Sequence, residues 1–254
     1  MKIDNPAFNY DKYGQQYSGQ RRTDPRIAAI IHAALGNAKT VLNVGAGGGS
    51  YEPEDRYVVA VEPSPVMRCQ RQVWNKTPAV IGVAGALPFD DASFDASMAL
   101  VTVHHWPDIR KGLQELRRVT RGQVLILSFD PDALEHFWNA RYFPEVIEIE
   151  RQRYPKIGGL TDALGGRCEI QEIPIPFDCV DGFQEAFYGR PEAFLEKEVR
   201  KAQSAWGFLK EGEEEIIVQR LADDLASGEW DKKFGHFRTQ PSFTCALRLI
   251  IAYP

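Results

Sequence analysis

The stretch TVLNVGAGGGS, residues Thr40–Ser50, decides the fold. Its short β-branched apolar run gives way to glycines, which predicts a buried strand followed by a tight loop. Gly45, Ala46 and Gly47 let the backbone turn and approach a ligand closely. We expect a helix to follow, with its N–H groups directed at an anionic or polar group. The same glycines are also compatible with a plain strand-to-helix turn.

Apolar runs and helical patterns alternate on both sides of this loop. We expect helices at Arg26–Gly36, Ser64–Trp74 and Ile109–Arg118, and further strands at Val58–Ser64, within 79–89, at Phe94–Val103 and at Gln123–Asp130. Pro25 suits the first turn of a helix, with Asp24 near its N-cap. Strands that alternate with helices in this way favour a parallel sheet.

The pattern changes beyond Asp130, where aromatic residues and helical spacing dominate. Two late strands are expected, at Cys168–Cys179 and Ser242–Tyr253, and they suit an antiparallel pair that closes the sheet. The segment between them, Val180–Pro241, is mostly helical. An insertion of this size in a compact domain is usually a lid or a binding element.

An acidic residue follows the second strand. Glu62 lies at the end of VVAVE, at about the distance from the glycine loop, roughly 20 residues, at which an acid contacts an adenosine ribose. A carboxylate there can accept hydrogen bonds from both ribose hydroxyls. A solvated strand-end carboxylate is the alternative, but the glycine loop next to it favours the ribose role.

These stretches resemble the class I S-adenosylmethionine-dependent methyltransferases, and most of all the subgroup that includes the ubiquinone and menaquinone methyltransferases. The resemblance runs in order through residues 37–130. It is carried by VLNVGAGGG, by VVAVEPSPVM, by ALPFDDASFDASMALVTVHHWPD and by LQELRRVTRGQVLILS.

The resemblance implies an α/β fold, with a Rossmann-like seven-stranded, mostly parallel sheet and a helical cap inserted before the last strand. Residues 1–254 are then one methyltransferase domain. Residues 1–36 form N-terminal lid helices, 37–130 the cofactor-binding core, and 131–167 and 180–241 the cap and substrate segments. The implied function is methyl transfer from S-adenosyl-L-methionine to a small-molecule acceptor at O, N or C.

The resemblance also assigns cofactor-binding roles. Besides the loop and Glu62, it places Pro63, Ala86 and Leu87 on the adenine, although Leu87 also suits simple core packing. Val101 would face the methionine and the methyl group. Asn43 stands where the family usually has Asp, and brings no charge. Near the N-terminus, Tyr13 and Tyr17 would close over the methionine end, and Arg21 or Arg22, with Arg22 preferred, would pair with the cofactor carboxylate.

Two adjacent histidines follow the fourth strand. His104 or His105 lies at the carboxyl edge of the sheet, where open α/β folds bind their ligands, and could act as a catalytic base near neutral pH. Alignment of the acceptor supplies much of the rate of such transfers, so a histidine that only lines the pocket or caps the strand is the alternative.

Composition excludes several other classes. The net charge of −5 disfavours a nucleic-acid substrate. The four cysteines include no CxxC pair, so no metal site is expected. No apolar run is long enough for a membrane span, and we expect a cytoplasmic monomer or homodimer.

Two other functions compete with methyl transfer. One is a non-catalytic regulator or scaffold that binds S-adenosylmethionine or S-adenosylhomocysteine. Asn43 motivates this alternative, as does Val83, which stands where the family often has Asp. The other is a nicotinamide-dependent oxidoreductase. That class needs Gly or Ala at the third glycine position, which is Ser50 here, so it is disfavoured.

Overall fold

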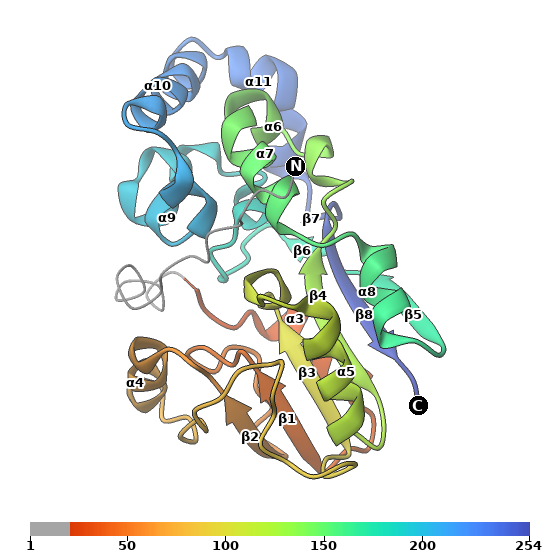
Figure 1. The fold of residues 1–254 in the computed structure, drawn as a ribbon. Coiled ribbons are helices and arrows are strands. Elements are labelled where there is room, and N and C mark those ends of the chain that lie inside the picture. Colours follow the sequence, from red (N-terminus) through yellow and green to blue (C-terminus); the bar gives the residue numbers. More distant parts are fainter. Residues whose placement is uncertain (1–20) are drawn as a thin grey trace.

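The computed structural model describes residues 21–254, and it is built around one twisted sheet (Figure 1). Within these residues the main sheet has six strands in the order β2-β1-β3-β4-β8-β5. The strands are β1 (Thr40–Val44), β2 (Tyr57–Val61), β3 (Ala96–Leu100), β4 (Val124–Phe129), β5 (Cys168–Glu172) and β8 (Leu247–Ala252). The first four are parallel, and β8 runs antiparallel to both β4 and β5. The expected Rossmann-like, mostly parallel sheet is therefore confirmed.

Both faces of the sheet are covered by helices, which explains why its four parallel strands are largely apolar. Leu125 and Leu127 of β4 pack on the face that carries α3 (Pro25–Ala34). Val124 and Ile126 point to the other face, against α5 (Ile109–Val119) and α8 (Ile157–Leu164). This period of two separates the core into two layers. Helix α3 begins as expected: Pro25 is in its first turn and the Asp24 side chain accepts a hydrogen bond from Arg26 N.

The expected count of seven strands is wrong by one. The apolar run before Leu87 forms only an isolated parallel bridge, Val61 to Val80. Val80 N donates to Ala60 O, and Val80 O accepts from Glu62 N, at 2.8 and 3.0 Å. The chain then turns away at Gly82, where a Cβ would lie 3.0 Å from a Val61 methyl carbon. The segment therefore lies along the edge of β2 without extending the sheet.

Each of the two expected late strands is divided. The first becomes β5 and a short β6 (Ile175–Pro176), and the second becomes β7 (Ser242–Phe243) and β8. Strands β6 and β7 pair in a separate two-stranded sheet. Pro174 separates β5 from β6, because proline cannot donate a hydrogen bond to a strand ladder.

Besides α4 (Pro65–Val73), which follows β2, five further helices gather beyond the carboxyl ends of the parallel strands (Figure 1). They are α6 (Asn139–Tyr142), α7 (Pro144–Arg153), α9 (Lys197–Lys201), α10 (Glu213–Ala226) and α11 (Glu229–Phe234), and we call them the cap. Their core is aromatic. The Trp138 ring meets those of Phe194 and Trp230 edge to face at 5.6 and 5.5 Å, a geometry that stabilises beyond simple burial. In the described part of the chain, no helix combines the length and the apolar character that crossing a membrane requires.

The two neighbours of β8 in the sheet, β4 and β5, allow a matched test of the core. Ile126 and Ile170 are both register partners of Ile250, but Ile126 is fully buried and Ile170 is 49% exposed on the edge strand. We expect Ile126→Ala to lower the free energy of unfolding by about 2–5 kcal/mol, because it leaves a cavity. Ile170→Ala should cost less than about 1 kcal/mol, because its side chain is half in water. Urea unfolding measures both, and equal losses would contradict this account of the sheet.

Candidate functional site

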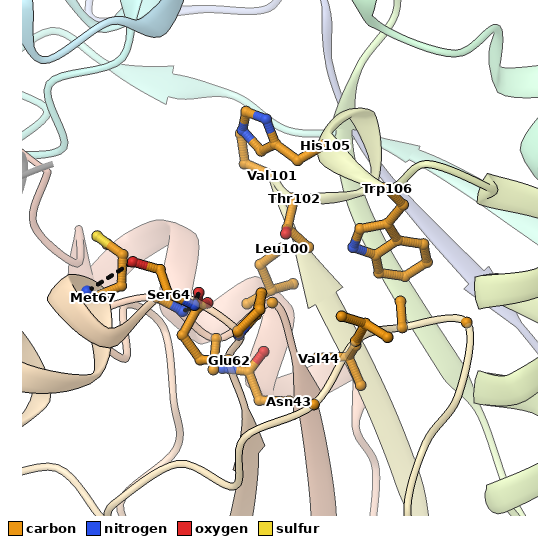
Figure 2. A pocket seen from close by; sticks show the side chains of 18 of the residues that line it. Asn43, Val44, Glu62, Ser64, Met67, Leu100, Val101, Thr102, His105 and Trp106 are labelled. Carbon is orange, nitrogen blue, oxygen red and sulfur yellow. Dashed lines mark hydrogen bonds between the residues drawn. The ribbon is translucent and has the colours of Figure 1, made fainter. Parts of the chain in front are cut away.

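A cavity of about 760 Å³ lies at the carboxyl edge of the parallel strands, within the size range of small-molecule and cofactor sites. Its walls come from β1 and the glycine loop, from the residues after β2 and β3, and from the segment 82–86. Figure 2 shows Asn43 and Val44 at one end of this space and His105 at the other. We call it the larger cavity.

Most residues proposed for the cofactor line this cavity. They are Asn43, Gly45, Ala46, Gly47, Glu62, Pro63, Ala86 and Val101, together with His105. Three other predicted residues lie elsewhere. Leu87 packs in the core, Arg22 is exposed while Arg21 lines the cavity, and His104 lines a second cavity. Tyr13 and Tyr17 lie outside the described residues.

The expected helix after the glycine loop is wrong. Residues 45–56 connect β1 to β2 by turns alone. Gly45, Gly47 and Gly49 have φ values of +70°, +51° and +95°, and Tyr51 has +62°. A right-handed helix cannot contain such residues, because its φ is near −60°. The loop's own N–H groups, rather than a helix terminus, are therefore the donors at this site.

Glu62 and the glycine loop are joined directly. The Glu62 carboxylate accepts hydrogen bonds from Gly47 N at 2.8 Å and from Ser64 N at 2.9 Å. The N–H groups of Gly45 and Ala46 donate to Val61 O, one residue earlier. Burial raises the pKa of Glu62, and the two backbone donors oppose that rise. The carboxylate is therefore held at a defined position on the cavity wall.

Asn43 takes part in a buried polar cluster beneath the loop. Its Nδ2 donates to Glu52 Oε1 at 2.9 Å. Arg71 of α4 (Pro65–Val73) pairs with both oxygens of the same carboxylate, at 2.9 and 3.0 Å. Arg71 also donates to Thr77 O at 2.8 Å. Asn43, Glu52 and Arg71 are 2%, 6% and 0% exposed, so the carboxylate is neutralised inside the protein.

The residue that follows β3 is strained. Val101 has a φ of +52°, which is rare for a β-branched residue and costs about 1–3 kcal/mol. Val101 N donates to Leu127 O at 2.8 Å, which keeps the turn attached to β4. Val101 lines both cavities, and His105 lies close to it in Figure 2.

The two histidines follow in a 3₁₀ turn, Val103–His105. Burial lowers the pKa of His104 well below its usual range, and burial together with the Arg153 charge lowers the pKa of His105 to about 3. Both rings are therefore neutral at physiological pH. The His104 ring centroid lies 3.9 Å from that of His105 and 4.3 Å from that of Tyr154.

Several residues at the inner cavity or in the buried cluster beneath the loop were not predicted from the sequence. Glu52 and Arg71 carry no motif, because their pairing depends on how α4 packs. Glu150 of α7 lines the second cavity, and its position could have been found. It shares a buried helix face with Val146, Ile147 and Arg153, at helical spacing. A carboxylate and an arginine one turn apart, on the face that carries Val146 and Ile147, are the signal.

Comparison with known proteins agrees with this geometry. Residues 42–127, from β1 to β4, match the family model of a methyltransferase domain. A putative methyltransferase from an antibiotic biosynthesis pathway of Anabaena variabilis superposes with a TM-score of 0.83, at 28% identity, over 92% of this chain and 98% of that one. Residues 42–127 are thus those of a methyltransferase domain, and the described fold is that of the class I S-adenosylmethionine-dependent methyltransferase family.

Within that family the chain is similar to several curated proteins. It is 33% identical to a malonyl-[acyl-carrier protein] O-methyltransferase of Erwinia pyrifoliae over 130 residues, which is 48% of this chain and 49% of that protein. It is 29% identical to a ubiquinone/menaquinone biosynthesis C-methyltransferase of a Geobacter species, over 63% of this chain and 72% of that protein. The chain thus spans about half the length of the Erwinia relative.

The buried cluster predicts that Asp at position 43, the residue usual in the family, would destabilise this protein. We expect Asn43→Asp to lower the free energy of unfolding by about 3 kcal/mol at neutral pH, because it replaces a donor to Glu52 with a second buried charge. The neighbouring carboxylate raises the pKa of the new group in the folded state. The loss should therefore shrink as the pH falls through that pKa.

Urea unfolding at neutral and at mildly acidic pH tests this prediction. The exposed Asn37→Asp is the matched control and should change stability little at either pH. Adding Glu52→Gln to Asn43→Asp restores a single negative charge beside Arg71, so the double variant should be more stable than the sum of the single losses. Additive losses would contradict the cluster as described.

The glycine loop allows a second matched pair. A Cβ on Gly45 would lie 2.1 Å from Thr102 Oγ1, whereas a Cβ on Gly48 meets nothing closer than 4.0 Å. Gly45 also has a positive φ. We expect Gly45→Ala to cost at least about 2 kcal/mol of stability, and Gly48→Ala less than about 1 kcal/mol. If thermal unfolding shows the two variants to be equally stable, the contact between the loop and Thr102 is looser than described.

Proposed function

We propose that the chain binds S-adenosylmethionine in the larger cavity and transfers its methyl group to a small-molecule acceptor by direct in-line displacement. The observation that carries this proposal is the link between Glu62 and the loop. A carboxylate able to accept hydrogen bonds from ribose hydroxyls is joined to Gly47 N at 2.8 Å, in a cavity of about 760 Å³.

The described residues fit this ligand at several points. The absence of a Cβ at Gly45 keeps Thr102 and the loop in close contact, so the backbone itself forms the wall of the cavity. Pro63 and Ala86 line the cavity and are proposed to lie against the adenine, while Val101 is proposed to lie near the methionine. When bound, the cofactor would supply a methyl group on a positively charged sulfur. The sulfur would be the leaving group, taking the electrons of the broken carbon–sulfur bond, as the acceptor atom bonds to the methyl carbon.

The chain's own contribution to the transfer is positioning and the exclusion of water. The cap covers the carboxyl edge of the sheet (Figure 1), and we propose that its segments, 131–167 and 180–241, supply the acceptor side of the site. Helix α8 of the first segment packs against α5. The cap side of the second cavity is instead formed by residues 134–154 and by the later segment.

His104 and His105 are proposed to act at the acceptor. Their depressed pKa values leave both rings neutral at physiological pH, so each has a ring nitrogen able to take a proton from an O–H or N–H acceptor. The low pKa also makes each a weak base, which suits a reaction driven mainly by alignment. The family match ends at residue 127, before the cap, so the acceptors named for the relatives are not transferred to this chain.

Glu62→Gln tests the proposal. It replaces one carboxylate oxygen with an amide and removes the charge, so we expect the affinity for S-adenosylmethionine and S-adenosylhomocysteine to fall by about 10- to 150-fold, or 1.5–3 kcal/mol. Calorimetry measures both ligands. Because the pKa of Glu62 is raised, wild-type affinity should also decline as the pH falls towards that pKa, and this dependence should be absent in the variant.

Glu54→Gln is the control, because Glu54 is exposed on the same loop. The affinity of this variant for S-adenosylmethionine and S-adenosylhomocysteine should equal that of the wild type. Formation of S-adenosylhomocysteine in the presence of a metabolite panel then separates a methyltransferase from a non-catalytic binder. Absence of heat with either adenosyl ligand would refute the proposed function.

A further inference from the structure

A second cavity, of about 40 Å³, adjoins the larger one. Arg21 and Val101 line both, so the two meet beside the strained turn after β3. We call the second one the inner cavity. Its apolar wall includes Phe129, Phe183 and Tyr154. At that volume it has room for one or two water molecules, or for a small polar group of a ligand.

The inner cavity is lined by buried polar atoms that lack hydrogen-bond partners among the described residues. They are His104 Nδ1, Asn139 Oδ1, Glu150 Oε2, Glu185 Oε2, and Oε1 and Nε2 of Gln203. All five side chains are at most 7% exposed. Each such atom costs about 1–3 kcal/mol if it stays unpaired, and native proteins contain few of them. Their concentration around one cavity indicates a binding site.

A chain of side-chain hydrogen bonds orients these groups. Asn139 Nδ2 donates to Gln184 Oε1 at 2.8 Å, and Gln184 Nε2 donates to Glu150 Oε1 at 3.2 Å. One N–H of each of these two amides is thereby used within the protein. Oxygen atoms of Asn139 and Glu150 are left for a ligand, together with those of Glu185 and Gln203. Acceptors outnumber donors on this surface.

Two cations also lie near the inner cavity, and Arg153 Nη2 is itself buried without a hydrogen-bond partner among the described residues. Arg153 Nη1 lies 3.8 Å from Glu150 Oε2 but donates its hydrogen bond to Ser204 Oγ at 2.9 Å. Arg21 pairs with Asp181 at 2.6 Å. Burial raises the pKa of Glu150, and it raises that of Glu185 to about 7. An amine beside these carboxyl groups would stabilise their ionised form, which accepts hydrogen bonds, whereas a ligand carboxylate would be repelled by that form.

We infer that the methyl acceptor carries an amine or a hydroxyl that enters the inner cavity and donates hydrogen bonds to its unpaired oxygens, and that a carboxylate or phosphate is rejected there. This inference rests on the proposed function and specifies its substrate class. The donor-rich end of the acceptor would lie among Asn139, Glu150 and Gln203, and the rest of the molecule in the larger cavity.

Three probes of equal size test the inference: 2-phenylethylamine, 2-phenylethanol and phenylacetate. They differ only in the polar end, which is a cationic donor, a neutral donor or an anionic acceptor. Calorimetry is carried out on the full chain saturated with S-adenosylhomocysteine. We expect the amine or the alcohol to bind at least about tenfold more tightly than phenylacetate, a difference of 1.4 kcal/mol.

Two substitutions locate the probe. Glu150→Gln removes the charge but keeps an oxygen for Gln184. Gln203→Met removes two unpaired atoms at similar volume. We expect Gln203→Met to weaken the preferred donor probe several-fold. Glu150→Gln should weaken the amine by about tenfold if the amine binds as a cation, and should weaken amine and alcohol alike if a neutral donor is recognised. Glu148→Gln, on the exposed side of α7, is the matched control and should change neither.

The outcomes separate the two proposals. Phenylacetate bound as tightly as the other probes, no heat from any probe at millimolar concentration, or selectivity unchanged in both variants would overturn the inference while leaving the cofactor site intact. Failure of S-adenosylhomocysteine itself to bind the wild type would refute the proposed function. Unchanged affinity for that ligand in both variants shows that they are folded.

Discussion

The buried ion pair between Glu52 and Arg71 is the contact on which the candidate site depends. Residues 45–56 link two parallel strands without a helix, so no ladder of helical hydrogen bonds supports them. Arg71 reaches from α4 to both oxygens of Glu52, and Asn43 donates to the same carboxylate. Loss of one partner of such a pair is costly, because it leaves a buried charge unpaired. The pair therefore connects β1, the loop and α4 as one unit.

This arrangement gives a physical reason for the amide at position 43. An Asp there would lie against Glu52 with only Arg71 to balance two charges. Asn43 instead donates a hydrogen bond and adds no charge. The amide at position 43 therefore has to be judged together with the buried carboxylate of Glu52.

The two cavities of the site are built by different parts of the chain. The larger one is built by the residues that match the methyltransferase family model, and the inner one mainly by the cap. Val101 and Arg21 lie where they meet. Because fold and cofactor site are shared by many chemistries, the choice of acceptor has to be read from the cap side chains. The buried oxygens of Asn139, Glu150 and Gln203 are the most specific feature on that side.

The local sequence pattern was sufficient to predict the parallel sheet, the position of the glycine loop and the carboxylate after β2. Strand periodicity, positive φ values and strand ends each favour particular residue types at neighbouring positions. It failed where an outcome depended on segments far apart in the chain. The segment at Val80 formed a bridge instead of a strand, and the loop formed turns instead of a helix. Tertiary packing alone decided two contacts. One is the pairing of Glu52 with Arg71, and the other is the meeting of His104, Glu150 and Gln203 at one cavity. Such contacts are set by how helices dock and not by the spacing of residues along the chain.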